Sequence, residues 1–178
     1  MGQKRSYAKL TGSDGQECVR DDVTGLIWEQ KVNNASSMRH TAYTYSWYST
    51  DAANNAGSSG TSNGGICLSA VSHCDTESYI ATLNSKQYCG YSDWRMPTRY
   101  ELNTILDVSR LPANAFDSSV FADTQSGFYW TGTPSSGNSA EAWYVSFFSA
   151  ETNYTGLKVA SGGLSASAYY VRAVRKLE

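Results

Sequence analysis

The residues with the clearest chemical potential are four cysteines and two histidines. The cysteines are Cys18, Cys67, Cys74 and Cys89, and the histidines are His40 and His73. A zinc site usually takes its cysteines in close C-x-x-C pairs, and no two of these have that spacing. Cysteine catalysis needs a free, acidified thiol near a histidine, whereas an even set of cysteines without a metal motif is typical of disulfides. We therefore predict two disulfides and no metal site.

The spacing of the cysteines suggests which of them pair. Four cysteines allow three pairings. The short interval between Cys67 and Cys74 favours a local bridge, which leaves Cys18 to pair with Cys89 across a long loop. Such a long-loop bridge can stabilise a domain by about 4 kcal/mol. Because disulfides persist outside the reducing cytosol, the protein is expected to be extracellular or on the cell surface.

Carboxylates and hydroxyls offer a second kind of chemistry. Pairs of carboxylates could hydrolyse glycosides, and the candidates are Asp93, Glu101, Asp107 and Asp123. Two of them have a simpler interpretation: Glu101 completes a helix capping box with Thr98, and Asp93 fits a turn or an ion pair with Arg95. A Ser-His-Asp triad is not supported, because the chain has no G-x-S-x-G elbow and both histidines lie in polar loops. We therefore expect no enzymatic activity, and a hydrolase that uses Asp107 or His73 is the remaining catalytic alternative.

Cofactors are not expected either. The glycine-rich segments 12–15 and 60–65 have no lysine and helix after them, so they do not match a phosphate-binding loop. Acidic pairs at Asp21 and Asp22, or at Asp75 and Glu77, could hold a structural calcium ion, although the spaced ligands of an EF-hand are missing.

Tyrosine, tryptophan, serine and asparagine point to recognition instead. The chain contains 13 Tyr and 5 Trp, and Tyr, Ser, Gly and Asn supply rigid contact area and adaptable hydrogen bonds in antibody combining sites. The tryptophans Trp28, Trp94, Trp130 and Trp143 are expected in the core. The predicted ligand-binding residues are Tyr129, Asn138, Tyr144, Asn153, Tyr154, Lys158, Tyr169 and Tyr170. Flat rings and polar side chains suit a glycan or a protein equally well.

Composition limits the partners and the size of the fold. A chain of 178 residues with 40% hydrophobic content can form one domain, which we assign to residues 16–176 after an N-terminal tail or first strand at 1–15. Met1 and Gly2, and Leu177 and Glu178, resemble cloning residues, and the first 20 residues lack the apolar segment of a signal peptide. The net charge of −2 argues against a nucleic-acid partner, and no run of about 20 apolar residues could enter a membrane.

Hydrophobic periodicity predicts two helices and several strands. A first strand is expected at 23–29, with Leu26 and Trp28 on one face. Residues 33–65 read as a long polar loop with one short strand around Tyr43 to Tyr48. Helices are expected from Asp75 or Thr76 to about Tyr88, and from Thr98 to between Asp107 and Arg110. Strands at 127–131, 142–147, 155–159 and 169–174 are expected to form an antiparallel meander.

Three segments together resemble a known family. They are CVRDDVTGLIWE (18–29), CGYSDWRMPTRYEL (89–102) and YYVRAVR (169–175). These segments are similar to the Lcl C-terminal domain family of bacterial surface proteins, which includes collagen-like adhesins, and the block D-W-R-x-P-T-x-x-E-L is the most specific part. The resemblance implies a C-type-lectin-like α+β fold with two helices packed on a twisted antiparallel sheet and long polar loops. It also implies kinship with formylglycine-generating enzymes and with retroelement variable proteins.

The resemblance does not bring a complete site with it. The calcium-dependent lectin motifs E-P-N, Q-P-D and W-N-D are absent, and no cysteine follows Cys89 to serve as in the oxidase relatives. Adhesins of the family are associated with sulfated glycosaminoglycans and with trimers, so a heparin-like ligand would need a basic patch of Lys158, Arg172 and Arg175.

We therefore expect an adhesion domain that binds a host or neighbouring-cell glycan or protein through loops between Tyr129 and Tyr170. A structural or assembly domain, such as a pilus tip or a trimerising end domain, is one alternative. A diversity-generating retroelement variable protein is another.

Overall fold

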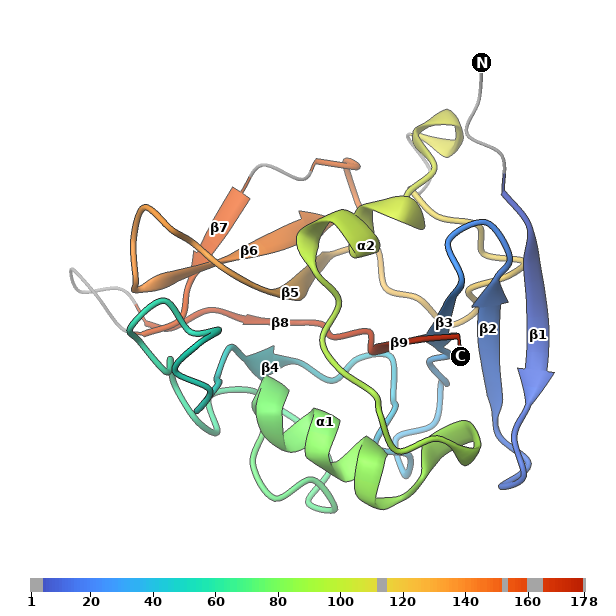
Figure 1. The fold of residues 1–178 in the computed structure, drawn as a ribbon, viewed down its shortest axis with the longest axis horizontal. Helices are drawn as coiled ribbons and strands as arrows, with labels where there is room; N and C mark the ends of the chain where they lie inside the picture. The colour runs from blue at the N-terminus through green and yellow to red at the C-terminus, as the bar shows by residue number, and fades with distance from the viewer. Residues whose placement is uncertain (1–4, 112–114, 152–153, 160–164, 178) are drawn as a thin grey trace.

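The computed structural model describes residues 5–111, 115–151, 154–159 and 165–177, and it shows two helices packed with three antiparallel sheets (Figure 1). The strands are β1 (Tyr7–Thr11), β2 (Glu17–Asp21), β3 (Leu26–Glu29), β4 (Tyr45–Ser46), β5 (Phe128–Pro134), β6 (Glu141–Ser146), β7 (Tyr154–Leu157), β8 (Ala168–Tyr169) and β9 (Val174–Lys176). The helices are α1 (Thr76–Ser85) and α2 (Arg99–Thr104), each followed by a short 3-10 turn, η1 (Tyr88–Gly90) and η2 (Val108–Arg110). The predicted α+β class is confirmed. No helix in these ranges has the length and apolar character needed to cross a lipid bilayer.

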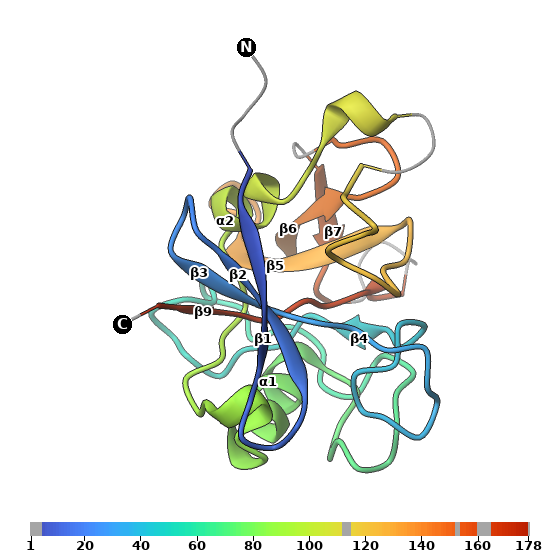
Figure 2. The same ribbon diagram turned by 90° about the vertical axis from the view of Figure 1, so that its right-hand side faces the viewer.

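The largest sheet has the strand order β1-β2-β3-β9 and separates the two larger core clusters. Strand β3 is buried on both faces, as a central strand should be. Leu26 and Trp28 face one core together, as predicted, whereas Ile27 faces the other. Helix α2 packs on the first side and α1 on the second, so the two helices lie on opposite faces of this sheet (Figures 1 and 2).

Strands β5, β6 and β7 form the predicted meander, but the expected fourth strand at 169–174 does not extend it as an antiparallel strand and touches β5 through a single parallel bridge between Tyr129 and Tyr170. That segment divides instead: β8 pairs with β4, and β9 pairs with β3. Side chains at Val171, Arg172 and Ala173 are all buried, so this stretch is enclosed on every side rather than alternating between a core and solvent. The predicted strand was wrong here because alternation of apolar and polar residues implies one buried and one exposed face, whereas this segment is buried throughout.

Both helices begin at the predicted caps and end earlier than predicted. The Asp75 side chain accepts a hydrogen bond from the Ser78 amide at the start of α1, and Thr98 and Glu101 form the expected capping box at α2. Helix α1 stops before Tyr88 because Gln87 and Cys89 adopt left-handed backbone conformations, with φ of 49° and 56°. This break turns Cys89 toward the main sheet.

The two predicted disulfides are present. Cys18 in β2 is bonded to Cys89 in η1, and Cys67 is bonded to Cys74 just before α1. The first bridge joins the main sheet to η1, just after α1, and the second closes a short loop between the long polar loop and α1.

A buried polar network connects β3 with α1. The Glu29 carboxylate is fully buried, lies 2.9 Å from the Lys31 ammonium, and accepts a hydrogen bond from the Tyr79 hydroxyl. Its second oxygen accepts a bond of 2.9 Å from the Ala173 amide. Burial lowers the pKa of Lys31 to about 8 despite the neighbouring carboxylate.

We predict that the two disulfides differ in their contribution to stability. The Cys18–Cys89 bridge spans 71 residues and the Cys67–Cys74 bridge spans 7. Loop-closure entropy predicts a loss of about 4 kcal/mol when Cys18 and Cys89 are both replaced by alanine, and about 2.5 kcal/mol for the same change at Cys67 and Cys74. Urea unfolding of the two double variants measures both values. Equal losses, or a larger loss for the short bridge, would contradict the prediction.

A second prediction concerns pH. The folded protein holds the Lys31 proton less tightly than the unfolded chain, where the pKa is near 10.5. The cost of burying this charge is therefore fully present at neutral pH and decreases as the pH rises through about 8. We expect the Lys31 contribution to the unfolding free energy to become more favourable by about 2 kcal/mol between about pH 7 and about pH 9.5. Thermal midpoints across this range should rise in the wild type and in Lys9→Met, whose lysine is exposed, and should stay flat in Lys31→Met.

Candidate functional site

Three of the predicted tyrosines form one surface with a phenylalanine. Phe128, Tyr144, Tyr154 and Tyr169 come from β5, β6, β7 and β8, and we call them the aromatic face. The Tyr144 and Tyr154 rings are stacked at 5.9 Å between centroids, and Phe128 lies 4.9 Å from Tyr144 and 5.4 Å from Tyr169. Phe128 is 42% exposed and Tyr154 is 45% exposed, so the rings remain open to solvent.

The aromatic face lies on a rigid support. Trp130 is fully buried beneath it and packs on Tyr169 at 4.5 Å. At Gly156 of β7, a Cβ atom would lie only 2.7 Å from both Trp130 and Tyr169, so this position needs glycine. Burial, and then the neighbouring Tyr169, raise the pKa of Tyr144, which keeps its hydroxyl protonated as a hydrogen-bond donor.

The other predicted ligand residues are distributed differently. Tyr129 is 1% exposed and stacked on Phe147 in the core, so its assignment to the surface is wrong. Tyr170 is half-buried against Tyr129. Asn138 is exposed in the β5–β6 turn and donates to Glu141, and Asn153 lies outside the described residues.

Lys158, Arg172 and Arg175 do not form the basic patch that a heparin-like ligand would need, because all three cations are buried. Lys158 donates two hydrogen bonds of 2.8 Å to main-chain carbonyls of Asn55 and Ser58. Arg172 donates to the Glu29 carbonyl at 2.6 Å.

Arg175, the third of these cations, pairs with Asp93 at 2.6 Å. Arg95, the expected partner of Asp93, pairs with Glu101 instead. Backbone carbonyls thus hold the charges of Lys158 and Arg172 inside the fold, and the Asp93 carboxylate holds that of Arg175.

The tryptophans are in the core with one exception. Trp28, Trp94 and Trp130 are buried as predicted. Trp143 is half-buried on β6, and the Arg99 guanidinium lies 4.2 Å above its ring.

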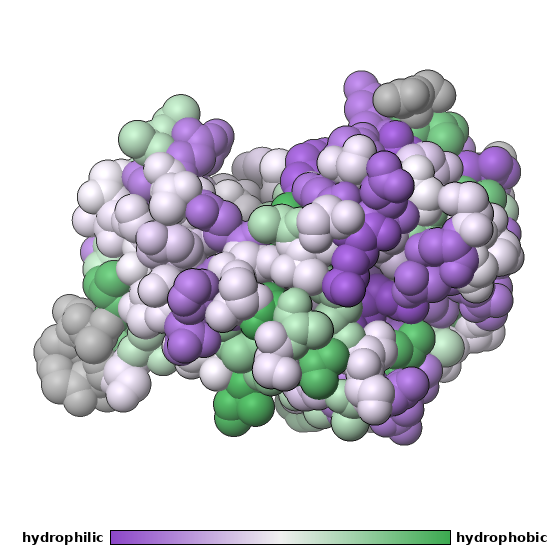
Figure 3. All heavy atoms as spheres, turned by 90° about the horizontal axis from the view of Figure 1, so that it is seen from below, coloured by the Kyte–Doolittle hydropathy of each residue, from purple (hydrophilic) through white to green (hydrophobic). Residues whose placement is uncertain are grey.

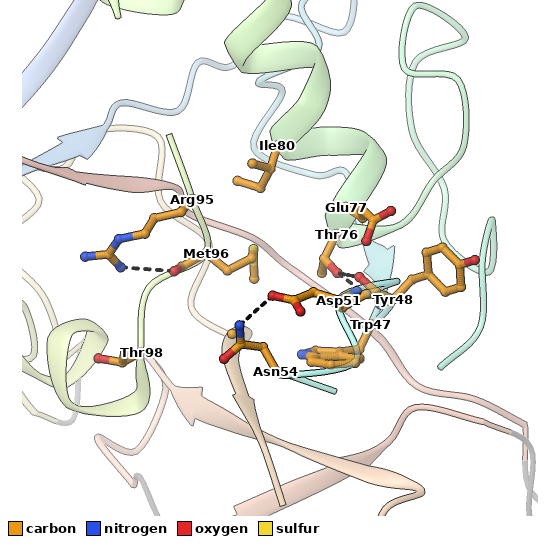
Figure 4. Close-up of a pocket in the computed structure, with 12 residues that line it drawn as sticks. Trp47, Tyr48, Asp51, Asn54, Thr76, Glu77, Ile80, Arg95, Met96 and Thr98 are labelled. Carbon is orange, nitrogen blue, oxygen red and sulfur yellow. Dashed lines mark hydrogen bonds between the residues drawn. The ribbon is translucent and has the colours of Figure 1, made fainter. Parts of the chain in front are cut away.

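A pocket of about 550 Å³ is the feature that the sequence did not reveal. Trp47, Asp51 and Asn54 of the long polar loop form one wall, Ile80 of α1 forms a second, and Arg95 and Met96 form a third (Figure 4). This volume falls in the range of small-molecule sites. The available signals were the unusual length of the loop at 33–65 and the family block at 93–102, which supplies Arg95, Met96 and Thr98 to the lining.

Main-chain hydrogen bonds and one buried lysine hold this pocket loop, which we define as residues 47–61. The Ser49 amide donates to the Ser59 carbonyl and the Thr61 amide to the Trp47 carbonyl, so the two ends of the loop are joined. Lys158 binds its middle from inside, as described above. Thr50 in turn donates to the Glu77 carboxylate of α1. The loop is therefore anchored at several points before any ligand arrives.

The remaining catalytic candidates, Asp107, His73 and His40, do not come together as a catalytic group. Asp107 caps η2 and forms ion pairs with Arg5 and Arg110. His73 is exposed, and half-buried His40 packs edge-on against Tyr43. Among the residues that the structure describes, no group of three or more His, Cys, Asp or Glu side chains could hold a metal ion.

Figure 3 shows the side on which α1 lies, where hydrophilic and intermediate residues cover most of the surface. Hydrophobic residues are concentrated toward the lower middle of the view, with a few elsewhere. Together with the aromatic face and the pocket, this defines a disulfide-bridged α+β domain with two open surfaces.

The chain belongs to the Lcl C-terminal domain family, whose model matches residues 17–175. This membership places it among adhesin-related domains, and its two disulfides are consistent with an extracellular location. Neither the curated proteins nor the solved structures give a significant match. Kinship with C-type lectins therefore stays a prediction from the sequence.

We predict that Lys158 keeps the pocket loop closed. Lys158→Met removes both donors to the Asn55 and Ser58 carbonyls, and an unsatisfied buried carbonyl costs about 1–3 kcal/mol. Amide exchange at Ser49 and Thr61 should therefore accelerate about tenfold or more. Lys9→Met is the matched control and should leave these rates unchanged. Unchanged exchange in Lys158→Met would show that the lysine does not hold the loop.

Proposed function

We propose that this protein is an extracellular recognition domain of the adhesin type that binds a glycan or protein surface through its aromatic face. One observation carries the proposal. Four partly exposed rings from four different strands converge on one surface, and three of them are tyrosines that the sequence indicated for binding.

The chemistry of the rings supports binding. Tyrosine offers a large contact area with few rotatable bonds, so little conformational entropy is lost when a ligand is bound. The stacked pair Tyr144 and Tyr154 has an interplanar angle of 13°, which gives a flat platform for a sugar ring or an apolar side chain. In this proposal the domain binds without catalysis and needs no cofactor or nucleic acid.

An assembly role is the second candidate, and the same exposed rings favour it. Phe128 and Tyr154 are among the large hydrophobic residues that lie open to solvent, and such residues often meet at subunit interfaces. Light scattering separates the two roles, since a monomer at micromolar concentration would argue against assembly. For a retroelement variable protein, a neighbouring reverse transcriptase gene and a near-copy template are the test.

We predict that Tyr154→Ala, and more strongly the double variant Tyr154→Ala, Tyr169→Ala, weakens target binding about tenfold or more, because interface tyrosines often contribute 2 kcal/mol or more. Glycan and protein arrays identify the target, and titration with that target gives the affinities. Tyr100→Ala is the control, since Tyr100 is 73% exposed on α2, outside the aromatic face.

Circular dichroism should show that the variants remain folded. If the wild type binds nothing on either array, or if the double variant binds as tightly as the wild type, the proposal fails.

A further inference from the structure

The charge that faces the pocket is negative. In Figure 4 the Asp51 carboxylate points into the pocket, whereas the Arg95 guanidinium points away from it. Arg95 is held there by two bonds to Glu101, at 2.6 and 2.8 Å, and by a bond to the Met96 carbonyl. A ligand in the pocket therefore contacts the Asp51 carboxylate rather than the Arg95 guanidinium.

Asp51 is fixed in this orientation by its own loop. Its Oδ1 accepts a hydrogen bond of 3.0 Å from the Ala53 amide, and its Oδ2 accepts one of 2.5 Å from the Asn54 side chain. These two bonds lower the pKa of Asp51, with Asn54 as the larger cause. The carboxylate is thus ionised and oriented at neutral pH.

The other charges around the pocket leave a negative balance. Glu77 adds a second carboxylate to the lining, and Thr50, which is neutral, donates to it. The Lys158 ammonium lies 4.4 Å from the centre of the Trp47 ring and is directed at loop carbonyls. Arg95 and Glu101 offset each other, as do Lys158 and one of the two lining carboxylates, so one negative charge remains.

The apolar part of the pocket favours an aliphatic body over a sugar. Ile80 and Met96 are half-buried and offer aliphatic surface. Trp47 is 2% exposed, so it presents no free ring face on which a sugar could stack. An aliphatic chain that ends in a cation matches both the apolar walls and the carboxylate.

We propose that this pocket binds the side chain of a lysine from a protein partner, with its methylenes along Ile80 and Met96 and its ammonium at the Asp51 carboxylate. The proposal is independent of ligand binding at the aromatic face. Its physical basis is preorganisation: the loop that carries Asp51 is anchored to α1 and to Lys158 before the partner arrives, which limits the entropy lost on binding.

The test is a titration of the full chain with acetyl-Gly-Lys-Gly-amide, followed by NMR. Signals of the Asp51 amide and of the Ile80 and Met96 methyl groups should shift. The norleucine analogue, which keeps the aliphatic chain and lacks the ammonium, should bind about tenfold more weakly or worse. Asp51→Asn, which keeps the shape of the side chain and an acceptor for the Ala53 amide but lacks the charge, should weaken binding of the lysine peptide by a similar factor.

Controls separate this site from a general charge effect and from the aromatic face. Glu17→Gln removes an exposed carboxylate on β2, outside the pocket, and should change nothing. Tyr154→Ala should also leave the titration unchanged, so failure at the aromatic face is distinguishable from failure here. Ile80→Thr keeps the carboxylate and shortens the apolar wall, and it should weaken binding while Asp51 stays in place.

Three results would overturn the proposal. The first is an absence of shifts with the lysine peptide at about 10 mM, a concentration that detects even weak single-residue binding. The second is equal binding by Asp51→Asn and the wild type when both have the same thermal midpoint. The third is tighter binding of glucosamine than of the lysine peptide, which would assign the pocket to amino sugars.

Discussion

The structure depends on one buried carboxylate, that of Glu29. Burying an ion is costly unless it is paired and hydrogen-bonded. Glu29 meets this requirement through Lys31, Tyr79 of α1 and the Ala173 amide of the C-terminal segment, and its own carbonyl accepts from Arg172. Its partners come from positions far apart in the chain. The carboxylate therefore joins β3 to α1 and to the C-terminal segment on the α1 side of the main sheet, and removal of a single partner would leave an uncompensated charge inside.

Features with local causes could be predicted from the sequence. The capping box at Thr98 and Glu101, the shared face of Leu26 and Trp28, and the short Cys67–Cys74 bridge each follow from residues near one another in the chain. The burial of Lys158 and Tyr129 could not be predicted in this way. Lys158 can be buried because the carbonyls of residues 55 and 58, about 100 positions away, accept hydrogen bonds from its ammonium group. A charged or aromatic residue on a strand carries no local sign of such a partner.

The same distinction between local and distant causes explains why the aromatic face was largely predicted and the pocket was not. Tyr144 and Tyr154 stood out because aromatic residues alternate on short strands that pair in sequence order, and a meander brings such strands together. Tyr169 reaches them from β8, which pairs with β4 outside the meander. The pocket needs the loop at 47–61, the start of α1 and the segment at Arg95 and Met96. That last segment lies in the D-W-R-x-P-T-x-x-E-L block of the family, but the block does not reveal which other parts of the chain face it. Residues 47–61 themselves were distinguished by the length of the loop alone.

The two open surfaces share a wall. Trp47 and Trp130 belong to one small core cluster, with Met96 packed against it on the pocket side and Tyr144 and Tyr169 on the aromatic side. The Trp47 indole donates to the Thr131 carbonyl of β5, and the Trp130 indole donates to the Tyr45 carbonyl of β4, both at 2.9 Å. These reciprocal bonds fix the pocket loop relative to the sheet that carries the aromatic face. A rigid wall of this kind sets the spacing between the surfaces, and a partner gains avidity from both only if its own groups match that spacing.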